Sequence, residues 1–369
     1  MIRPAQVVSL IVAGVALAAA GVWLVSRQSS DSTPPVQAPV LQLTPDALNS
    51  VTQVHIFKGD GSHVTLKHEG TRWIVAERDY PADTGQVRKL LLDLAALKSE
   101  EQKTADPALY SKLGVADPAG ASTTSIGVDI DLKGKTQRLI VGKTSGTDAV
   151  YVRVAGQAQS LLVTPQLTPD ADPRHWLDRS LLDISPDQVT AIDIEVRGTP
   201  DYGIKRSAAG AADNFVVRPI PKGRKLADAG AAAAQAGTLA GLQFDDVRKA
   251  GTIAAAAQAV FTTREGLTLT IAGIKDGELR YIRVTASATA PAAQAHARDL
   301  NARVAGWEFE LPGYRYDGLF KPLEQLLVPK PSKAPASSAP GSAPNQSPIG
   351  SRAAPTNLPF GPKAQGESH

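Results

Sequence analysis

The chain of 369 residues has no cysteine and a single methionine. Without cysteine it has no disulfide bonds, no thiol nucleophile and no cysteine-ligated metal site. An excess of one charge is also lacking, because 39 basic residues nearly balance 36 acidic residues and leave a net charge of +3. The basic residues are scattered along the chain, so the composition indicates neither nucleic acid nor an anionic surface as a partner.

One long run, from Val7 to Val25, is both uncharged and predominantly apolar. At about 1.5 Å of rise per residue, a helix of this length spans the hydrocarbon core of a bilayer. Residues 16–18 or 18–20 could form a signal-peptidase site, but the run continues through Trp23, which favours an uncleaved anchor. A short positive stub before the run favours a cytoplasmic amino terminus. We therefore expect a single-pass protein of the inner membrane with its soluble part in the periplasm.

The rest of the chain divides by composition into further parts. We expect an anchor at residues 1–28, a polar, proline-containing linker at 29–48, and two folded modules at 49–185 and 186–328. Residues 329–369 are rich in proline, alanine and serine and have few large apolar side chains. Such a tail is expected to be disordered, because it buries too little surface to offset the entropy of ordering.

Self-similarity between the two modules indicates an internal duplication. Residues 51–56 resemble 189–194, and residues 150–154 resemble 279–284. Residues 82–83 match 227–228, and at the same offset 100–105 match 245–250, so we expect this register to hold across a whole helix. Each module is expected to run hairpin, helix, hairpin. The expected fold class is α+β, with two copies of an antiparallel sheet packed with a helix.

Local patterns in the first module specify a hairpin and a helix. A three-residue loop at residues 59–61 is expected between the first two strands, because it puts the apolar residues of both strands on one face. The pattern D-x-x-Q from Asp83 to Gln86 predicts the start of a helix, whose apolar stripe covers the sheet. The strand residues are Val54, Ile56, Val64 and Leu66, and the stripe consists of Val87, Leu90, Leu91, Leu94 and Leu97.

Two motifs suggest ligands but fit a simpler interpretation. Residues 141–146 end like a phosphate-binding loop, yet its first glycine is replaced by Gln137 and a strand pattern follows, so a hairpin turn is favoured. His55 and His63 are expected on one outward face, where they could share a metal. Spacing indicates no third ligand, and two solvated histidines are the favoured interpretation.

Acidic residues occur in pairs that could serve acid–base chemistry. Residues 100–101 and 245–246 are adjacent acids expected at helix ends, where they do not face each other. Asp193 and Glu195 alternate with apolar residues, as on the solvent face of a strand. Serine-hydrolase signatures are absent. We therefore assign no catalytic, cofactor-binding or metal-binding residue, and we expect no enzymatic activity and no cofactor.

Two aromatic segments close the modules. In residues 176–182, a tryptophan precedes an Asp-Arg pair and two leucines, residue types that hold modules together or bind a partner. Internal packing is the favoured alternative. Residues 307–327 close the second module in a comparable way, with Tyr314, Tyr316, Phe320 and Leu323.

With these motifs in hand, the chain resembles a bacterial envelope family known as domain of unknown function 4340. The resemblance covers residues 51–182 well and the second module weakly, since residues 80–83 become Lys-Leu-Ala-Asp at 225–228. It implies a single-pass envelope protein with an exported α+β region, and some relatives look like auxiliary components of ABC-type export systems. The motifs are residues 73–75, 80–83, 113–114, 117–118, 141–142, 151–153 and 176–179.

Two functions are therefore expected as alternatives. The first is a membrane-anchored periplasmic accessory or scaffold protein, which docks on an envelope partner such as ABC transporter subunits. The second is a periplasmic glycan- or peptide-binding or hydrolytic module, suggested by Trp73, Trp176, Tyr202 and the carboxylates. A deep pocket with convergent carboxylates would favour the second function. The sequence leaves the identity of the partner and the oligomeric state open.

Overall fold

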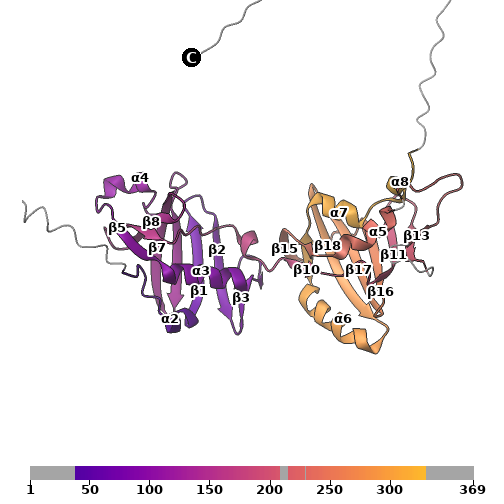
Figure 1. Ribbon diagram of the computed structural model, residues 1–369, viewed down its shortest axis with the longest axis horizontal. Helices are drawn as coiled ribbons and strands as arrows, with labels where there is room; N and C mark the ends of the chain where they lie inside the picture. The colour runs from indigo at the N-terminus through magenta and orange to yellow at the C-terminus, as the bar shows by residue number, and fades with distance from the viewer. Residues whose placement is uncertain (1–37, 208–214, 229, 330–369) are drawn as a thin grey trace, which may run out of the picture. The chain divides into compact units, whose positions relative to one another are not determined.

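The computed structural model describes residues 38–207, 215–228 and 230–329 (Figure 1). The expected anchor at residues 1–28 and nearly all of the expected tail lie outside these residues. No helix within the described ranges has both the length and the hydropathy needed to cross a membrane. The described part has mixed α and β structure, with antiparallel sheets and few helices, as the composition and patterning predict.

The first sheet has nine strands, all paired antiparallel, in the order β4-β3-β2-β1-β6-β7-β8-β9-β5. Its strands are β1 (Val51–Lys58), β2 (His63–Glu69), β3 (Arg72–Val75), β4 (Tyr80–Pro81), β5 (Lys98–Gln102), β6 (Ile126–Leu132), β7 (Lys135–Ser145), β8 (Ala149–Val154) and β9 (Ser160–Thr164). Two short helices, η2 (Pro107–Leu109) and α4 (Tyr110–Leu113), lie between β5 and β6, and η3 (Pro173–Trp176) follows β9.

The second sheet has eight antiparallel strands in the order β13-β12-β11-β16-β17-β18-β19-β15. Its strands are β11 (Val189–Val196), β12 (Tyr202–Arg206), β13 (Phe215–Arg218), β15 (Asp246–Lys249), β16 (Ala257–Thr263), β17 (Leu267–Asp276), β18 (Leu279–Ala288) and β19 (Trp307–Glu310). A separate pair of short strands joins β10 (Ser180–Leu182) to β14 (Leu242–Gln243).

The two sheets repeat one strand order once β4 is set aside. β3-β2-β1-β6-β7-β8-β9-β5 in the first corresponds to β13-β12-β11-β16-β17-β18-β19-β15 in the second. A local irregularity also repeats, because the first strand of each sheet carries a register shift near its start. There the Thr52 hydroxyl donates to the Asp131 carbonyl at 3.3 Å, and the Thr190 hydroxyl donates to the Thr262 carbonyl at 3.0 Å. This agreement extends the self-similarity of the sequence to backbone detail.

Helix α3 (Thr84–Ala96) lies across the first sheet (Figure 1) and begins where the capping pattern predicts. The Asp83 carboxylate accepts from the backbone N–H groups of Gly85 at 2.8 Å and Gln86 at 3.1 Å. The Gln86 side chain donates back to the same carboxylate at 3.2 Å. The predicted stripe is buried against the sheet, as the members Val87, Leu90, Leu91, Leu94 and Leu97 show.

The β1–β2 hairpin has the predicted three-residue loop. Ile56 pairs with Val64 and Val54 with Leu66, so all four side chains lie on the buried face. The Lys58 N–H donates to the Ser62 carbonyl at 2.9 Å and closes the loop over residues 59–61. The expected register is therefore confirmed.

Two expectations about the second half and the acidic pairs were wrong. The helix expected after residues 227–228 is only α5 (Ala231–Ala236), which lacks a side-chain cap and is followed by the 3-10 turn η4 (Gly237–Leu239). A longer helix, α6 (Pro291–Val304), is inserted between β18 and β19 and has no counterpart in the first half. The acids at residues 100–101 lie on β5, and Asp246 begins β15, so these pairs lie at sheet edges and not at helix ends.

Residues 38–48, which were assigned to the linker, belong to the folded part. The Val40 N–H donates to the Leu97 carbonyl at 3.1 Å, and the Ser99 N–H donates to the Ala38 carbonyl at 3.2 Å. Leu41 and Leu43 are only 3% and 7% exposed, and α2 (Pro45–Asn49) follows them. Two apolar side chains are enough to bind this segment to the core, although its proline content resembles a spacer.

Candidate functional site

The segment Tyr80–Asp83, one of the family-like motifs, is held between two other motifs. The Ala82 N–H donates to the Trp73 carbonyl at 2.8 Å, and the Asp83 N–H donates to the Trp176 carbonyl at 2.7 Å. Both tryptophans are buried, and burial raises the pKa of Tyr80 to about 12. These motif residues therefore hold the backbone in place and present no free reactive group.

The segment that follows Trp176 packs internally, as the sequence favoured. The Trp176 indole N–H donates to the Asp170 carbonyl at 2.8 Å. Arg179 donates through Nε to the Phe244 carbonyl at 2.7 Å and through Nη2 to the Asp245 carboxylate at 2.9 Å. Arg179 thus attaches this segment to the chain just before β15.

A second group of motif residues surrounds Arg153 on β8. Its guanidinium is buried, donates through Nε to the Val115 carbonyl at 3.0 Å and through Nη2 to Asp117 at 2.9 Å, and lies over the Tyr110 ring. On the neighbouring strand, a Cβ at Gly142 would collide with the Leu113 carbonyl. The motifs around residues 113–118, 142 and 151–153 therefore form one structural contact between loop and sheet.

The residues that resemble a phosphate-binding loop lie in β7 and the turn that follows. Lys143 donates to the Lys112 carbonyl at 3.0 Å, and Gly146 occupies the turn with φ of 68° before β8 continues the sheet. A phosphate-binding loop needs a helix at this point, whose amino-terminal N–H groups contact the phosphate. The hairpin interpretation is confirmed.

The two histidines on the outer face of the first sheet lie together as expected. The rings of His55 and His63 are 5.9 Å apart, and His55 also stacks on Phe57. Burial is the main cause that lowers the pKa of His55, against the opposing effect of Asp129. No group of three His, Cys, Asp or Glu side chains in the described ranges has metal-binding geometry.

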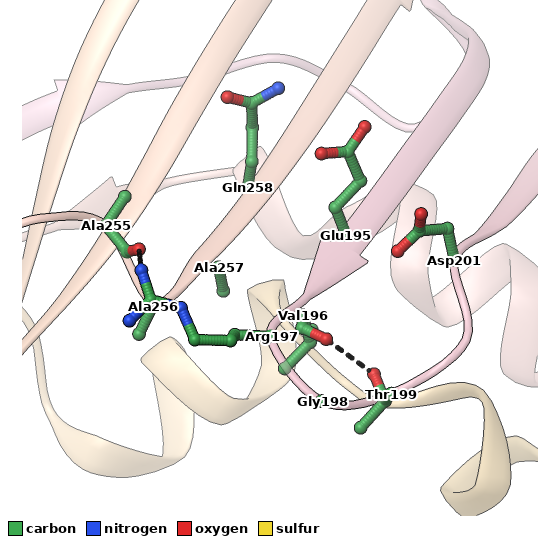
Figure 2. Close-up of a pocket in the computed structure, with 10 residues that line it drawn as sticks. All are labelled: Glu195, Val196, Arg197, Gly198, Thr199, Asp201, Ala255, Ala256, Ala257 and Gln258. Atoms are coloured by element: carbon green, nitrogen blue, oxygen red, sulfur yellow. Dashed lines mark hydrogen bonds between the residues drawn. The ribbon is translucent and has the colours of Figure 1, made fainter.

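An open hollow of about 340 Å³ lies beside the end of β11 and the start of β16 (Figure 2). Glu195 and Asp201 supply carboxylates, and Gln258 an amide, at its rim. The Arg197 guanidinium donates to the Ala255 carbonyl at 3.0 Å and fixes one wall. As predicted for alternating acids, Asp193 and Glu195 are exposed. The Thr199 hydroxyl, which also lines the hollow, already donates to the Val196 carbonyl at 2.9 Å.

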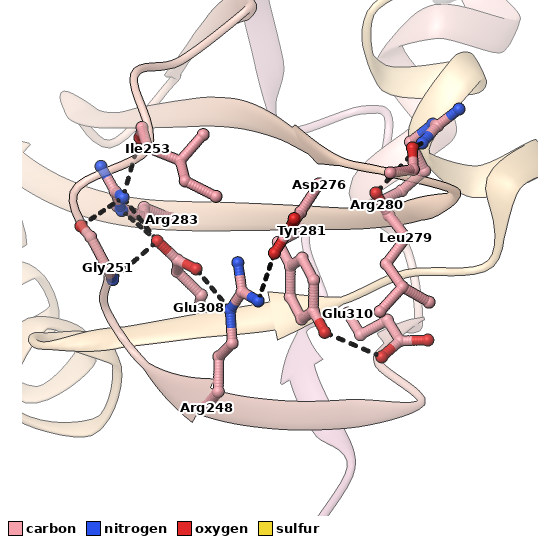
Figure 3. A network of polar contacts seen from close by, with 11 residues as sticks. Arg248, Gly251, Ile253, Asp276, Leu279, Arg280, Tyr281, Arg283, Glu308 and Glu310 are labelled. Carbon is pink, nitrogen blue, oxygen red and sulfur yellow. Dashed lines mark hydrogen bonds and ion pairs between the residues drawn. The ribbon is translucent and has the colours of Figure 1, made fainter.

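The most elaborate polar arrangement in the described part of the chain surrounds Glu308 (Figure 3). The Glu308 side chain, on β19, is 0% exposed. One oxygen accepts from Arg248 Nε at 2.7 Å, and the other from Arg283 Nε at 2.9 Å and from the Gly251 N–H at 3.0 Å. Burial would raise the pKa of Glu308, but the hydrogen bonds from Arg283 and Arg248 outweigh burial and lower it.

The network extends outward from Arg248. Its Nη1 donates to Asp276 at 2.7 Å, and the guanidinium lies 3.7 Å from the centroid of the Tyr281 ring. The Tyr281 hydroxyl donates to Glu310 at 3.3 Å. The pKa of Tyr281 is raised, and burial is the main cause. Because both oxygens of Glu308 are already bonded, this carboxylate is arranged for stability and not for proton transfer.

Sequence reasoning did not find this network. Glu308 stands between Trp307 and Phe309, an alternation that suggests an exposed acid on a half-buried strand. Its partners come from β15 and β18. The only local sign is that Arg248 and Arg283 both lie on strands beside bulky apolar residues, which does not indicate their pairing.

The aromatic residues that suggested glycan binding are part of the core. Trp73, Trp176 and Tyr202 are all buried, and the Tyr202 hydroxyl donates to the Lys321 carbonyl at 2.7 Å. In the closing segment Tyr316 is buried, whereas Tyr314 is 73% exposed. Phe320 and Leu323, the remaining aromatic and apolar residues singled out there, are buried too.

The structure defines a mixed α/β protein of two antiparallel sheets with the same strand order. Its buried charged groups, Glu308 and Arg153, form ion pairs with other side chains of the protein. Comparison with protein families identifies it further. A family model described as a domain of unknown function (DUF4340) matches residues 73–260, about half of the chain. The chain belongs to this family. The match begins at β3 and ends within β16, so it extends further into the second sheet than the resemblance suggested.

No curated protein and no solved structure matches the chain.

Proposed function

We propose that this protein is a membrane-anchored accessory or scaffold protein of the bacterial envelope, without enzymatic activity. In this proposal residues 7–25 cross the inner membrane once and the folded part lies in the periplasm. There it docks on a membrane complex, such as the subunits of an ABC-type exporter.

The observation that carries this proposal is the short distance along the chain between the uncharged run and the folded part. The run ends at Val25, and the folded part begins at residue 38 with the segment paired to Leu97 and Ser99. The intervening residues 26–37 can extend to at most about 40 Å. A helix at residues 7–25 would therefore keep the first sheet close to the bilayer, within reach of other membrane proteins.

The polar groups of the folded part support binding over catalysis. The most buried ionic groups, Glu308 and Arg153, are bonded to protein partners. The hollow of Figure 2 is an open rim and not a deep pocket. The glycan-binding alternative depended on aromatic side chains that are buried in the core, so its motivation is weakened.

The experiment is co-purification from cells after gentle crosslinking, with an affinity tag on the full chain. We expect recovery of membrane transport subunits with the wild-type chain. The matched control replaces residues 7–25 with a cleavable secretion signal. Cleavage should release the folded part from the membrane and reduce recovery of the same subunits. The proposal would be contradicted if no membrane protein were recovered in repeated experiments, or if the control chain recovered the same subunits as well as the wild-type chain does.

A further inference from the structure

β13 forms one edge of the second sheet, and the equivalent edge of the first sheet is β3. The equivalence follows from the register of each strand with its neighbour. Leu66 pairs with Val75 in the first sheet, and Ile204 pairs with Val217 in the second. Next to these pairs, Trp73 stacks on His68 at 4.9 Å, and the Arg206 guanidinium lies 4.4 Å from the centroid of the Phe215 ring.

In the first sheet the outer edge of β3 is covered by a strand. Ile74 pairs with Pro81, and Val75 pairs with Tyr80, so β4 adds antiparallel to this edge. The chain then forms an isolated bridge between Ala82 and Leu177. The edge of β3 therefore pairs with a short extended segment through backbone hydrogen bonds, and an equivalent edge can pair in the same way.

In the second sheet the corresponding segment takes another path. A bridge of the same form joins Leu226 to Leu327. The chain between β13 and Leu226, however, contains Pro219 and Pro221 and pairs with no strand among the described residues. Within residues 38–207, 215–228 and 230–329, no backbone hydrogen bond reaches the outer edge of β13. Val216 and Val217, the positions equivalent to Ile74 and Val75, therefore have no counterpart of β4 in the part of the chain that the structure describes.

The uncovered edge is apolar and basic. Val216 is 40% exposed, and Ile220, just beyond the strand, is 36% exposed. Exposed cations lie on and near this edge, and none of them has an ion-pair partner in the described part of the chain. Arg218 is on β13, Lys205 is on the neighbouring strand β12, and Lys222 and Lys225 are in the segment after β13.

The charge of this edge selects among possible occupants. Arg218 on β13 and the lysines near it oppose pairing with the same edge of a second copy, because like charges would face each other. The same charges attract a strand that carries carboxylates. Exposed Val216 gives such a strand an apolar contact on the outer face of the sheet.

We propose that the outer edge of β13 binds an extended acidic segment of a partner protein, which adds antiparallel beside Val216 and Val217 as β4 adds beside Ile74 and Val75. This inference rests on the proposed function, since it names the surface through which the accessory protein docks. The recognised chemistry is an alternation of carboxylate and apolar side chains on one strand.

Binding is measured by fluorescence anisotropy with the purified full chain in detergent. The probes are two labelled peptides of about eight residues, one alternating glutamate with valine and the other alternating lysine with valine. The acidic peptide is expected to bind saturably and the basic peptide not. In the double variant Arg218→Glu/Lys222→Glu the affinity for the acidic peptide should fall by roughly tenfold, and the basic peptide should bind instead.

The matched control is Lys67→Glu/Lys98→Glu, which reverses two exposed cations of the first sheet and should leave acidic-peptide binding unchanged. A photocrosslinking residue at Val216 should capture the acidic peptide, whereas the same residue at Leu92, exposed on α3, should not. Equal binding of both peptides, no effect of reversal, or capture of a second copy at Val216 would overturn the proposal. These assays use no membrane partner, so their failure leaves the co-purification result to be judged separately.

Discussion

The carboxylate of Glu308 provides the sharpest test of the structural account. Glu308→Gln keeps the size of the side chain but removes its charge. One of its oxygens becomes an NH₂ group, which cannot accept from the guanidinium or N–H groups that surround it. Arg248 and Arg283 would then lose their common counter-charge.

The expected cost follows from burial. Removing one partner of a buried ion pair costs roughly 3–5 kcal/mol. The side chains of Arg248 and Arg283 are 34% and 30% exposed, so both can regain some hydration, whereas Glu308 is 0% exposed. We therefore expect Glu308→Gln to reduce the free energy of unfolding by about 2–3 kcal/mol.

The pH dependence has a definite sign. The pKa of Glu308 in the folded protein is lowered from its ordinary value of 4.5, so the folded state favours the ionised form. Its contribution is fully present above 4.5 and is lost as the pH falls through the folded pKa. The difference in stability between wild type and Glu308→Gln should therefore be largest near neutral pH and shrink in acid.

Urea denaturation followed by tryptophan fluorescence measures this difference, because Trp307 is the neighbour of Glu308. The control is Glu195→Gln, which removes an exposed carboxylate from the rim of the hollow and should change stability by less than about 0.5 kcal/mol. A Glu308→Gln variant as stable as Glu195→Gln, or a difference that grows in acid, would refute the reasoning.

Three further substitutions test the remaining contacts by the same denaturation assay. Asp83→Ala removes the cap of α3 and should cost about 1 kcal/mol; no loss would mean that the cap contributes nothing. Gly142→Ala places a Cβ against a backbone carbonyl and should cost at least about 1–3 kcal/mol, whereas Gly313→Ala, with open space around it, should be nearly neutral. Arg153→Leu leaves the Val115 carbonyl without its donor and should cost about 1–3 kcal/mol, and equal stability would contradict its structural role.

Features set by short-range chemistry could be predicted from the sequence. The loop at residues 59–61 follows from the need to bury Val54 and Leu66 on one face, and the start of α3 follows from the D-x-x-Q pattern at Asp83. The duplication could be predicted because residues 51–56 resemble 189–194 and residues 82–83 match 227–228. These features depend on residues within one turn, one hairpin or one repeat.

Features set by distant partners could not be predicted. In the sequence Glu308 resembles a solvent-facing acid, because its partners Arg248 and Arg283 lie on other strands, far from it along the chain. Leu41 seemed part of a linker because its burial depends on the core of the first sheet. The sequence predicts helix ends for the acids at residues 100–101 and 245–246, because a constant offset between repeats indicates equivalence but does not distinguish a helix from a strand.

The orientation of the chain across the membrane is the central claim, and the lack of cysteine makes it directly measurable. Single cysteines are introduced at exposed Tyr314 and at Ala5, and cells with a permeabilised outer membrane are treated with a maleimide that cannot cross the inner membrane. The account predicts that both variants sediment with membranes and that Tyr314→Cys is labelled in these cells while the inner membrane is intact, whereas Ala5→Cys is labelled only after lysis. Recovery of the protein in the soluble cytosolic fraction, or protection of Tyr314→Cys until lysis, would contradict the account.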